Sequence, residues 1–397
     1  MHIVIAAKSL QRGMYLSCKG QPPPLGGGLR KAGYADLDGY VLSDEGYETT
    51  LAAAPFEVRV DPTRMLLPFS GETAGVPVVH TERQRHDAYL KELEQATVLQ
   101  ERSLTVSRDV ESRVNRGEAL PVQETREVIQ DMIGSLSHNR NVLLSLSRLK
   151  QWDEYTYTHS MNVALYGTLL AKYMGADDAT TEAIGVAGFF HDIGKLFVPL
   201  EIINFPGKLS DEQFKLVRKH PEYGETYGVE VSGLTDGIRR GIVEHHERYD
   251  GKGYPKGKKA NEISTAGQML LVADIYDALS SRRCYKPAMS SGDSLALMYR
   301  ERGSMYAPGM LESFIKAVGV YPSGCLVRLS DNSVAIVTEQ TASSLQPQVV
   351  VLMDAWGGRL KPPLLLDLSR NKTLTIKGCA PSDTVPLDLQ QAVFDAS

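Results

Sequence analysis

Histidine and aspartate are concentrated in one stretch of the chain, between positions 159 and 274. Five of the nine histidines lie there, two of them adjacent to each other, together with two unusual aspartates. Imidazole and carboxylate groups are ligands that first-row transition metals accept, so such a set can hold divalent ions if its members converge. The seven side chains are His159, His191, Asp192, His220, His245, His246 and Asp274.

Each motif alone also has an explanation without metal chemistry. His191-Asp192 can be a solvated helix end, and His245-His246 can be an exposed helix surface. An aspartate inside an apolar segment, such as Asp274, can be satisfied by a hydrogen bond. A shared site is favoured because the motifs fall on successive predicted helices, and several helices that each supply one or two ligands suit a two-metal centre.

Helices are the elements that must position these residues. Apolar periodicity and capping signals predict that Asp277 lies on nearly the same helix face as Asp274, where it can support a ligand from behind. The predicted helices cover residues 159–174, 180–190, 210–220, 235–247, 263–280, 290–302 and 309–318.

The pattern outside the helices predicts a multi-domain α+β fold. A mainly α-helical bundle at about 120–320 is preceded by short strand-like runs (2–6, 39–42 and 56–60) between Gly- and Pro-rich turns. It is followed by a small antiparallel β appendix with period-two alternation. The predicted parts are a β-rich N-terminal domain (1–75), a charged helical linker (76–120), a helical domain that carries the candidate site (121–320) and a β-rich C-terminal appendix (321–397).

The linker has mixed-sign charges and a thin apolar stripe at Leu90, Leu93 and Val98. Two interpretations stay open: a helix that packs on its own domain, or a coiled coil that forms a homodimer, for which clean heptads are lacking.

Bulk composition excludes several classes of protein. A net charge of −5 gives no global basic surface for a nucleic acid polymer. Four cysteines without a CxxC pair favour a reducing cytoplasm over a disulfide framework. The N-terminus lacks a basic segment and an 18-residue apolar run, so we expect neither a signal peptide nor a membrane span.

With these residues in view, the chain resembles the HD-GYP family, a subgroup of the HD metal-dependent phosphohydrolases. The resemblance covers roughly residues 120–320, about half the chain, and its most specific stretch is HHERYDGKGYPKG at 245–257. The other matching stretches are Tyr157-Thr158-His159-Ser160, HDIGK at 191–195, Lys219-His220-Pro221 and VADIYDALSSRRCYK at 272–286.

The resemblance implies a helical HD domain that hydrolyses the bacterial second messenger cyclic di-GMP. The product would be linear pGpG, with further cleavage to GMP left open, and the nucleophile would be a hydroxide that bridges two metal ions. Lowering the second messenger would affect biofilm formation, motility or virulence. The first 75 residues resemble a small regulatory β-rich domain that often precedes such modules, which implies protein partners.

The resemblance also implies residue roles. The seven residues named first would be the metal ligands, with Asp192 as the bridge and Lys195 close to the scissile phosphate, so that both are catalytic. Gly253-Tyr254-Pro255 would shape the substrate pocket, with Tyr254 stacked on a guanine or lining the wall. Arg283 and Lys286 would contact phosphate and base.

Three departures from the family pattern matter. Tyr155 stands where some members place a metal-binding Glu, so we expect two ions rather than three. The donor set suits iron or manganese, with nickel or zinc as second choices. Cys284 replaces a usual Pro and Phe205 a usual Lys.

Two other functions stay open. One is a non-catalytic cyclic di-GMP receptor or interaction module. The other is a nucleotide phosphohydrolase of the wider superfamily, or a phosphodiesterase for a related cyclic dinucleotide.

Overall fold

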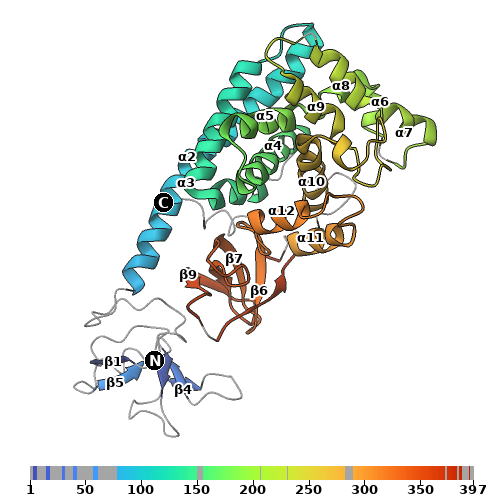
Figure 1. The fold of residues 1–397 in the computed structure, drawn as a ribbon. Coiled ribbons are helices and arrows are strands. Elements are labelled where there is room, and N and C mark those ends of the chain that lie inside the picture. Colours follow the sequence, from blue (N-terminus) through green and yellow to red (C-terminus); the bar gives the residue numbers. More distant parts are fainter. Residues whose placement is uncertain are drawn as a thin grey trace.

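Figure 1 shows the computed structural model of the chain, in which the helices come from the middle of the sequence and the antiparallel sheets come from its two ends. This confirms the predicted mainly helical bundle with β elements before and after it. The structure describes residues 3–6, 15–17, 29–31, 39–42, 57–60, 78–149, 155–205, 207–229, 231–281, 289–371, 373–381, 384–386 and 393.

The helices begin where a side chain can accept a hydrogen bond from a free backbone N–H group. Asp177, Ser210, Thr235, Ser264 and Ser290 each cap a helix in this way. The elements are α2 (Val78–Arg116), α3 (Val122–Leu149), α4 (Tyr155–Tyr173), α5 (Asp178–Phe190), η3 (Ile193–Phe197), α6 (Leu200–Ile203), α7 (Asp211–Val217), α8 (His220–Val229), α9 (Asp236–Glu244), η4 (Ala260–Glu262), α10 (Thr265–Ser280), α11 (Ser291–Arg300) and α12 (Met310–Val318).

Two predicted helices end differently from the sequence expectation. The helix expected at 210–220 is two helices, because α7 ends at Val217 and α8 begins at His220. The helix expected at 235–247 ends at Glu244, so His245 and His246 follow α9 instead of lying on it. Both differences move histidines from helix faces to helix ends.

An aromatic cluster fixes α4, α10 and α12 against one another. Tyr166 of α4 meets Tyr276 of α10 with ring centroids 5.1 Å apart, and Tyr276 meets Phe314 of α12 at 5.0 Å, both edge-on. All three side chains are fully buried, and such aromatic pairs contribute beyond their buried area. This core sets the spacing of α4 and α10, which carry His159 and Asp274.

Helix α2 packs on the helical body, which favours the first interpretation of the linker. Leu93, Ala96 and Leu99 are buried in the main core, on one face of the helix. The prediction for Val98 is wrong, because its side chain is 67% exposed, whereas Leu90 has no described side chain. A 3.6-residue period places Leu99, not Val98, on the face that contains Leu93 and Ala96.

The N-terminal strands form an antiparallel sheet with the order β1-β5-β2-β4-β3. The strand-like runs predicted from the sequence near 2–6, 39–42 and 56–60 coincide with three of them. The strands are β1 (Ile3–Ala6), β2 (Tyr15–Ser17), β3 (Leu29–Lys31), β4 (Gly39–Leu42) and β5 (Glu57–Val60).

The C-terminal sheet has the order β10-β6-β7-β8-β9 and is joined to α3 by polar side chains. Asn139 donates to Glu339 of β7, and Asn141 accepts from Ser323. Its strands are β6 (Leu326–Leu329), β7 (Val334–Glu339), β8 (Gln348–Met353), β9 (Arg359–Asp367) and β10 (Ile376–Cys379). The exact division of the chain into four domains stays a prediction. None of the described helices is long and apolar enough to cross a membrane.

A close approach of η3 to α8 positions two of the candidate ligands. A Cβ added to Gly194 would lie 1.8 Å from the carbonyl oxygen of His220 and 2.7 Å from the backbone nitrogen of Gly224. Both are backbone atoms, so no side-chain rotation can make room. Only glycine therefore allows α8 to bring His220 toward Asp192, which directly precedes η3.

We predict that Gly194→Ala lowers the free energy of unfolding by about 1–3 kcal/mol, because α8 must move away from η3. Gly134→Ala in α3 is the matched control, since a Cβ there meets nothing within 4 Å and alanine is the better helix former. Urea unfolding followed by circular dichroism measures both variants. Equal stability of Gly194→Ala and wild type would contradict the assigned contact.

Candidate metal centre

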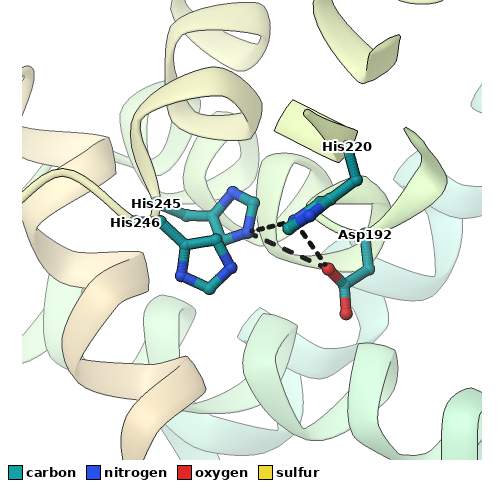
Figure 2. Close-up of side chains that lie close together, drawn as sticks. All are labelled: Asp192, His220, His245 and His246. Carbon is teal, nitrogen blue, oxygen red and sulfur yellow. Dashed lines mark hydrogen bonds and ion pairs between the residues drawn. The ribbon is translucent and has the colours of Figure 1, made fainter. Parts of the chain in front are cut away.

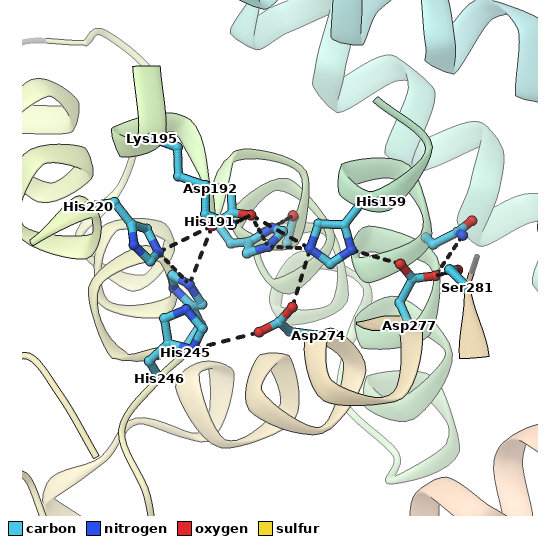
Figure 3. A network of polar contacts seen from close by, with 12 residues as sticks. His159, His191, Asp192, Lys195, His220, His245, His246, Asp274, Asp277 and Ser281 are labelled. Carbon is cyan, nitrogen blue, oxygen red and sulfur yellow. Dashed lines mark hydrogen bonds and ion pairs between the residues drawn. The ribbon is translucent and has the colours of Figure 1, made fainter. Parts of the chain in front are cut away.

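The seven residues singled out in the sequence converge on one buried cluster (Figure 3). They come from five places in the helical body, and five of the seven lie at or beside a helix end. His159 is in α4, His191 and Asp192 follow α5, His220 begins α8, His245 and His246 follow α9, and Asp274 is in α10.

Three of the histidines are oriented by the helices that end just before them. In each, ring atom Nδ1 contacts a backbone carbonyl three residues earlier, one of the carbonyls that a helix end leaves without an internal partner. A carbonyl only accepts, so the proton is on Nδ1 and the Nε2 lone pair points into the cluster. The pairs are His191 with Gly188 at 2.7 Å, His220 with Val217 at 2.7 Å and His245 with Ile242 at 2.6 Å.

A carboxylate orients the fourth histidine. His159 Nδ1 lies 2.7 Å from Oδ2 of Asp277, which is 1% exposed. The other carboxylate oxygen accepts from Asn162 at 2.8 Å and Ser281 at 2.9 Å. Asp277 thus lies behind a candidate ligand, where such carboxylates fix the ring and strengthen the imidazole as a donor.

One oxygen of Asp192 faces the first group of imidazoles, drawn in Figure 2. Oδ1 lies 3.2 Å from His220 Nε2 and 3.9 Å from His245 Nε2, and these two nitrogens are 3.2 Å apart. His246 completes the group, since one donor atom from each of these four residues fits within 4.8 Å.

The other oxygen of Asp192 faces a second group. Oδ2 lies 3.3 Å from His191 Nε2 and 3.6 Å from His159 Nε2, with the two nitrogens 3.3 Å apart. Asp274 also spans both groups, because its Oδ1 is 3.2 Å from His159 Nε2 and its Oδ2 is 3.7 Å from His246 Nδ1.

The donor atoms fit divalent cations. Imidazole lone pairs that face each other at 3.2–3.3 Å repel unless a cation or a proton lies between them. Asp192 Oδ1 is buried and accepts no hydrogen bond from the described residues, a deficit that normally costs about 1–3 kcal/mol. Nitrogen and oxygen donors of this kind suit first-row transition metals.

Burial and neighbouring charge set the protonation of the cluster. Burial lowers the pKa of His246 to about 3, and burial with the surrounding histidines holds the pKa of His245 well below its usual value. Burial also lowers the pKa of His159, but hydrogen bonds with Asp274 and Asp277 outweigh it and raise the pKa to about 9. A cation bound at Nε2 of His159 would replace that proton.

Burial raises the pKa of the Asp192 carboxyl, yet interactions with His191 and with the Lys195 ammonium outweigh burial and hold this pKa well below its usual range. The pKa of Asp274 is lowered in the same way, chiefly through its hydrogen bond with His159. Both groups are therefore carboxylates at neutral pH.

The loop at 248–262 closes over one side of the cluster. A Cβ on Gly253 would lie 2.3 Å from the backbone nitrogen of Arg248 and 2.5 Å from the carbonyl oxygen of His246, so only glycine fits. The Tyr254 ring lies against His246 with centroids 4.6 Å apart.

A buried acid that the sequence analysis missed fastens this loop. Glu247 is 1% exposed and accepts from the backbone nitrogens of Lys256 at 2.7 Å and Lys258 at 3.0 Å. It stands in a run of charged residues, a pattern typical of a solvated loop, so its residue type did not distinguish it. Only its place directly after the histidine pair gave a signal.

The remaining predicted site residues are placed as follows. Lys195 Nζ lies 2.5 Å from Asp192 Oδ2 and is 35% exposed. Arg283, Cys284 and Lys286 lie outside the described residues. Tyr155 is the first residue of α4, and Phe205 is 43% exposed beyond α6.

Comparison with known proteins identifies the helical part. Residues 137–309 match the HD domain family. This segment contains both His191-Asp192 and Gly253-Tyr254-Pro255. Residues 137–309 therefore carry an HD domain, and the Gly-Tyr-Pro stretch agrees with the resemblance to the HD-GYP subgroup. HD-domain phosphohydrolases bind divalent metal ions, and the cluster of the HD domain has the donors for them.

Curated proteins of similar sequence include two phosphodiesterases. The chain is 37% identical over 269 residues to a cyclic di-GMP phosphodiesterase of Pseudomonas aeruginosa, covering 67% of this chain and 65% of that protein. It is 36% identical over 168 residues to 3'3'-cGAMP-specific phosphodiesterase 3 of Vibrio cholerae, covering 42% of this chain and 36% of the relative. The chain thus spans somewhat under two thirds of the first relative and about a third of the second.

Among solved structures, an HDG"Y"P protein from Bdellovibrio bacteriovorus is similar with a TM-score of 0.48 and 14% identity. The similarity covers 80% of this chain and 99% of that one.

We predict that Asp277→Asn weakens metal binding by about 10–100-fold. An amide N–H group facing His159 would push the proton from Nδ1 to Nε2, where it blocks the lone pair. Asp178→Asn is the control, since Asp178 has a 90% exposed side chain in the first turn of α5. Competition with a fluorescent chelator measures affinity, and unchanged affinity in Asp277→Asn would refute this role.

Adding Mn²⁺ to metal-stripped protein should raise the midpoint of thermal unfolding by about 5–10 °C at a hundredfold excess over the dissociation constant. The rise should be lost in His220→Ala and kept in His138→Ala, whose side chain in α3 is 82% exposed. Differential scanning fluorimetry gives the comparison. An equal rise in both variants would mean that the ion binds elsewhere.

Proposed function

We propose that this chain is a metal-dependent phosphodiesterase that hydrolyses cyclic di-GMP to linear pGpG. The observation that carries the proposal is the buried cluster in which the two oxygens of Asp192 face two groups of imidazole nitrogens. The 37% identity to a cyclic di-GMP phosphodiesterase over two thirds of the chain supports the substrate.

The two groups of donors would hold two ions, with Asp192 shared between them. His220, His245 and His246 belong to one group and His159 and His191 to the other, while Asp274 faces both. Divalent cations would supply the Lewis acidity that makes a phosphodiester reactive and a water acidic. We assign iron or manganese, and two ions rather than three, because Tyr155 has no carboxylate.

The chain's own residues would orient the substrate and its charge. The Lys195 ammonium, one-third exposed beside Asp192, can donate to a non-bridging phosphate oxygen where negative charge develops. His191 and His245 are fully buried, so bulk water does not reach the floor of the site. Arg283 and Lys286 remain our candidates for further contacts with phosphate and base.

The choice of cyclic dinucleotide needs a direct comparison, because some relatives are specific for 3'3'-cGAMP. A preference for cyclic di-GMP is proposed from the Pseudomonas aeruginosa relative, whose match runs over 269 residues and is therefore longer than the HD domain segment at 137–309. A panel of cyclic di-GMP, 3'3'-cGAMP and a mononucleotide distinguishes the three substrates.

We predict that protein loaded with Mn²⁺ or Fe²⁺ converts cyclic di-GMP to pGpG, and that His191→Ala lowers kcat/KM more than about a hundredfold. Even residues behind metal ligands cost that much when they are replaced. His138→Ala is the matched control, because this exposed histidine is outside the cluster. Chromatography of the products over time measures the rate.

Two outcomes would replace the proposal. Binding of cyclic di-GMP without turnover under either metal would indicate a receptor. Faster cleavage of 3'3'-cGAMP or of the mononucleotide would change the substrate while leaving the metal centre in place.

A further inference from the structure

A cation stands beside the metal cluster and takes no part in the site described so far. Arg218 is the C-cap residue of α7, two positions before His220, and is half-buried. Its guanidinium carbon lies 4.6 Å from the centroid of the Tyr254 ring and 5.8 Å from that of Phe214. Among the residues that the structure describes, no carboxylate lies within ion-pair distance of it.

The Tyr254 ring joins this cation to the candidate metal ligands. Its centroid is 4.6 Å from the His246 ring, at a tilt of 30°, and 6.4 Å from the His220 ring. His246 and Lys195 are 19% and 35% exposed, whereas His191 and His245 are fully buried. The cluster is therefore accessible to solvent on the side of His246 and Lys195. Tyr254 and the Arg218 guanidinium that contacts it lie on the same side.

Several arginines of the helical part are paired with carboxylates: Arg102 with Glu127, Arg126 with Glu182 and Arg239 with Asp236. Arg218 instead rests on an aromatic face, which favours the cation without using its in-plane N–H donors. The guanidinium N–H donors of Arg218 lie in one plane and are not used by the aromatic contact. They can bind two oxygens of one anion at the same time.

A cyclic dinucleotide supplies such an anion. It contains two phosphodiester groups, and only one can be at the metal ions when it is cut. The second remains charged beside the carboxylates of Asp192 and Asp274, so it needs a cation of its own. Lys195 is 2.5 Å from Asp192 and serves the first group.

The geometry points to Arg218 as the residue that binds the phosphodiester group that is not cut, with Tyr254 as the residue that positions it. This assignment rests on the proposed function. In this assignment the Tyr254 ring contacts the Arg218 guanidinium and does not stack on a guanine base. The aromatic contact limits the positions of the long arginine side chain, so less entropy is lost when the phosphate binds.

The test compares Arg218→Gln with Arg218→Lys and with Arg328→Gln, a control on β6 whose side chain donates to the Asn332 carbonyl. Steady-state kinetics on the Mn²⁺-loaded full chain should show KM for cyclic di-GMP raised about 10–100-fold in Arg218→Gln. The rise should be smaller in Arg218→Lys, which keeps the charge but loses the fork. The control should match wild type.

A substrate without a second phosphate isolates the interaction. Bis(p-nitrophenyl) phosphate has one diester group and no base, so the loss in kcat/KM caused by Arg218→Gln should be at least tenfold smaller with it than with cyclic di-GMP. Equal losses on both substrates would mean that Arg218 acts through the metal ligands, and no rise in KM would mean that it does not bind substrate. Either result overturns the assignment.

Cyclic di-AMP separates phosphate from base. If Arg218→Gln raises KM by the same factor for cyclic di-GMP and cyclic di-AMP, phosphate binding is supported. A rise in KM confined to cyclic di-GMP would show a guanine contact and overturn the assignment. If wild type does not turn over cyclic di-GMP, the proposed function fails by itself. Calorimetric affinities of the same variants for both dinucleotides then decide the role of Arg218.

Discussion

The site depends on hydrogen bonds between histidine rings and the ends of helices. An α-helix leaves its last carbonyls without internal partners. His191, His220 and His245 each satisfy one of these carbonyls through Nδ1, and this bond alone fixes which nitrogen keeps the proton. The same hydrogen bond therefore satisfies a carbonyl at a helix end and leaves Nε2 of the ring free to bind a metal ion. This arrangement occurs three times around Asp192.

Helix ends can serve in this way only if the helices hold fixed positions. Close backbone contacts provide that rigidity where glycine permits them: a Cβ on Gly188 would lie 2.9 Å from the Cα atom of Ala164 in α4. The close contact at Gly194 fixes the position of η3 relative to α8 in the same way. The apolar core offsets the cost of gathering unprotonated donors and carboxylates in one buried volume, a cost that falls once cations occupy it.

The sequence predicted the seven converging residues because their types are rare inside apolar helices and recur on successive ones. It did not predict that His245 and His246 follow a helix, because the apolar pattern continues to them and capping by an imidazole has no strong sequence signal. Val98 and Leu99 are adjacent apolar residues, so only tertiary packing decides which is buried. Glu247 and Arg218 stand among charged residues and became visible through burial and ring contacts.

Helix α2 packs in the same hydrophobic core as the helices that carry the site. Its core residues pack with those of the HD domain, and Tyr157 in the first turn of α4 donates to Glu111 of α2. Tyr157 is two residues before His159, whose ring is held from the other side by Asp277. Tyr157 and His159 lie on the same helix, so this contact holds α2 against the part of α4 that carries a candidate ligand.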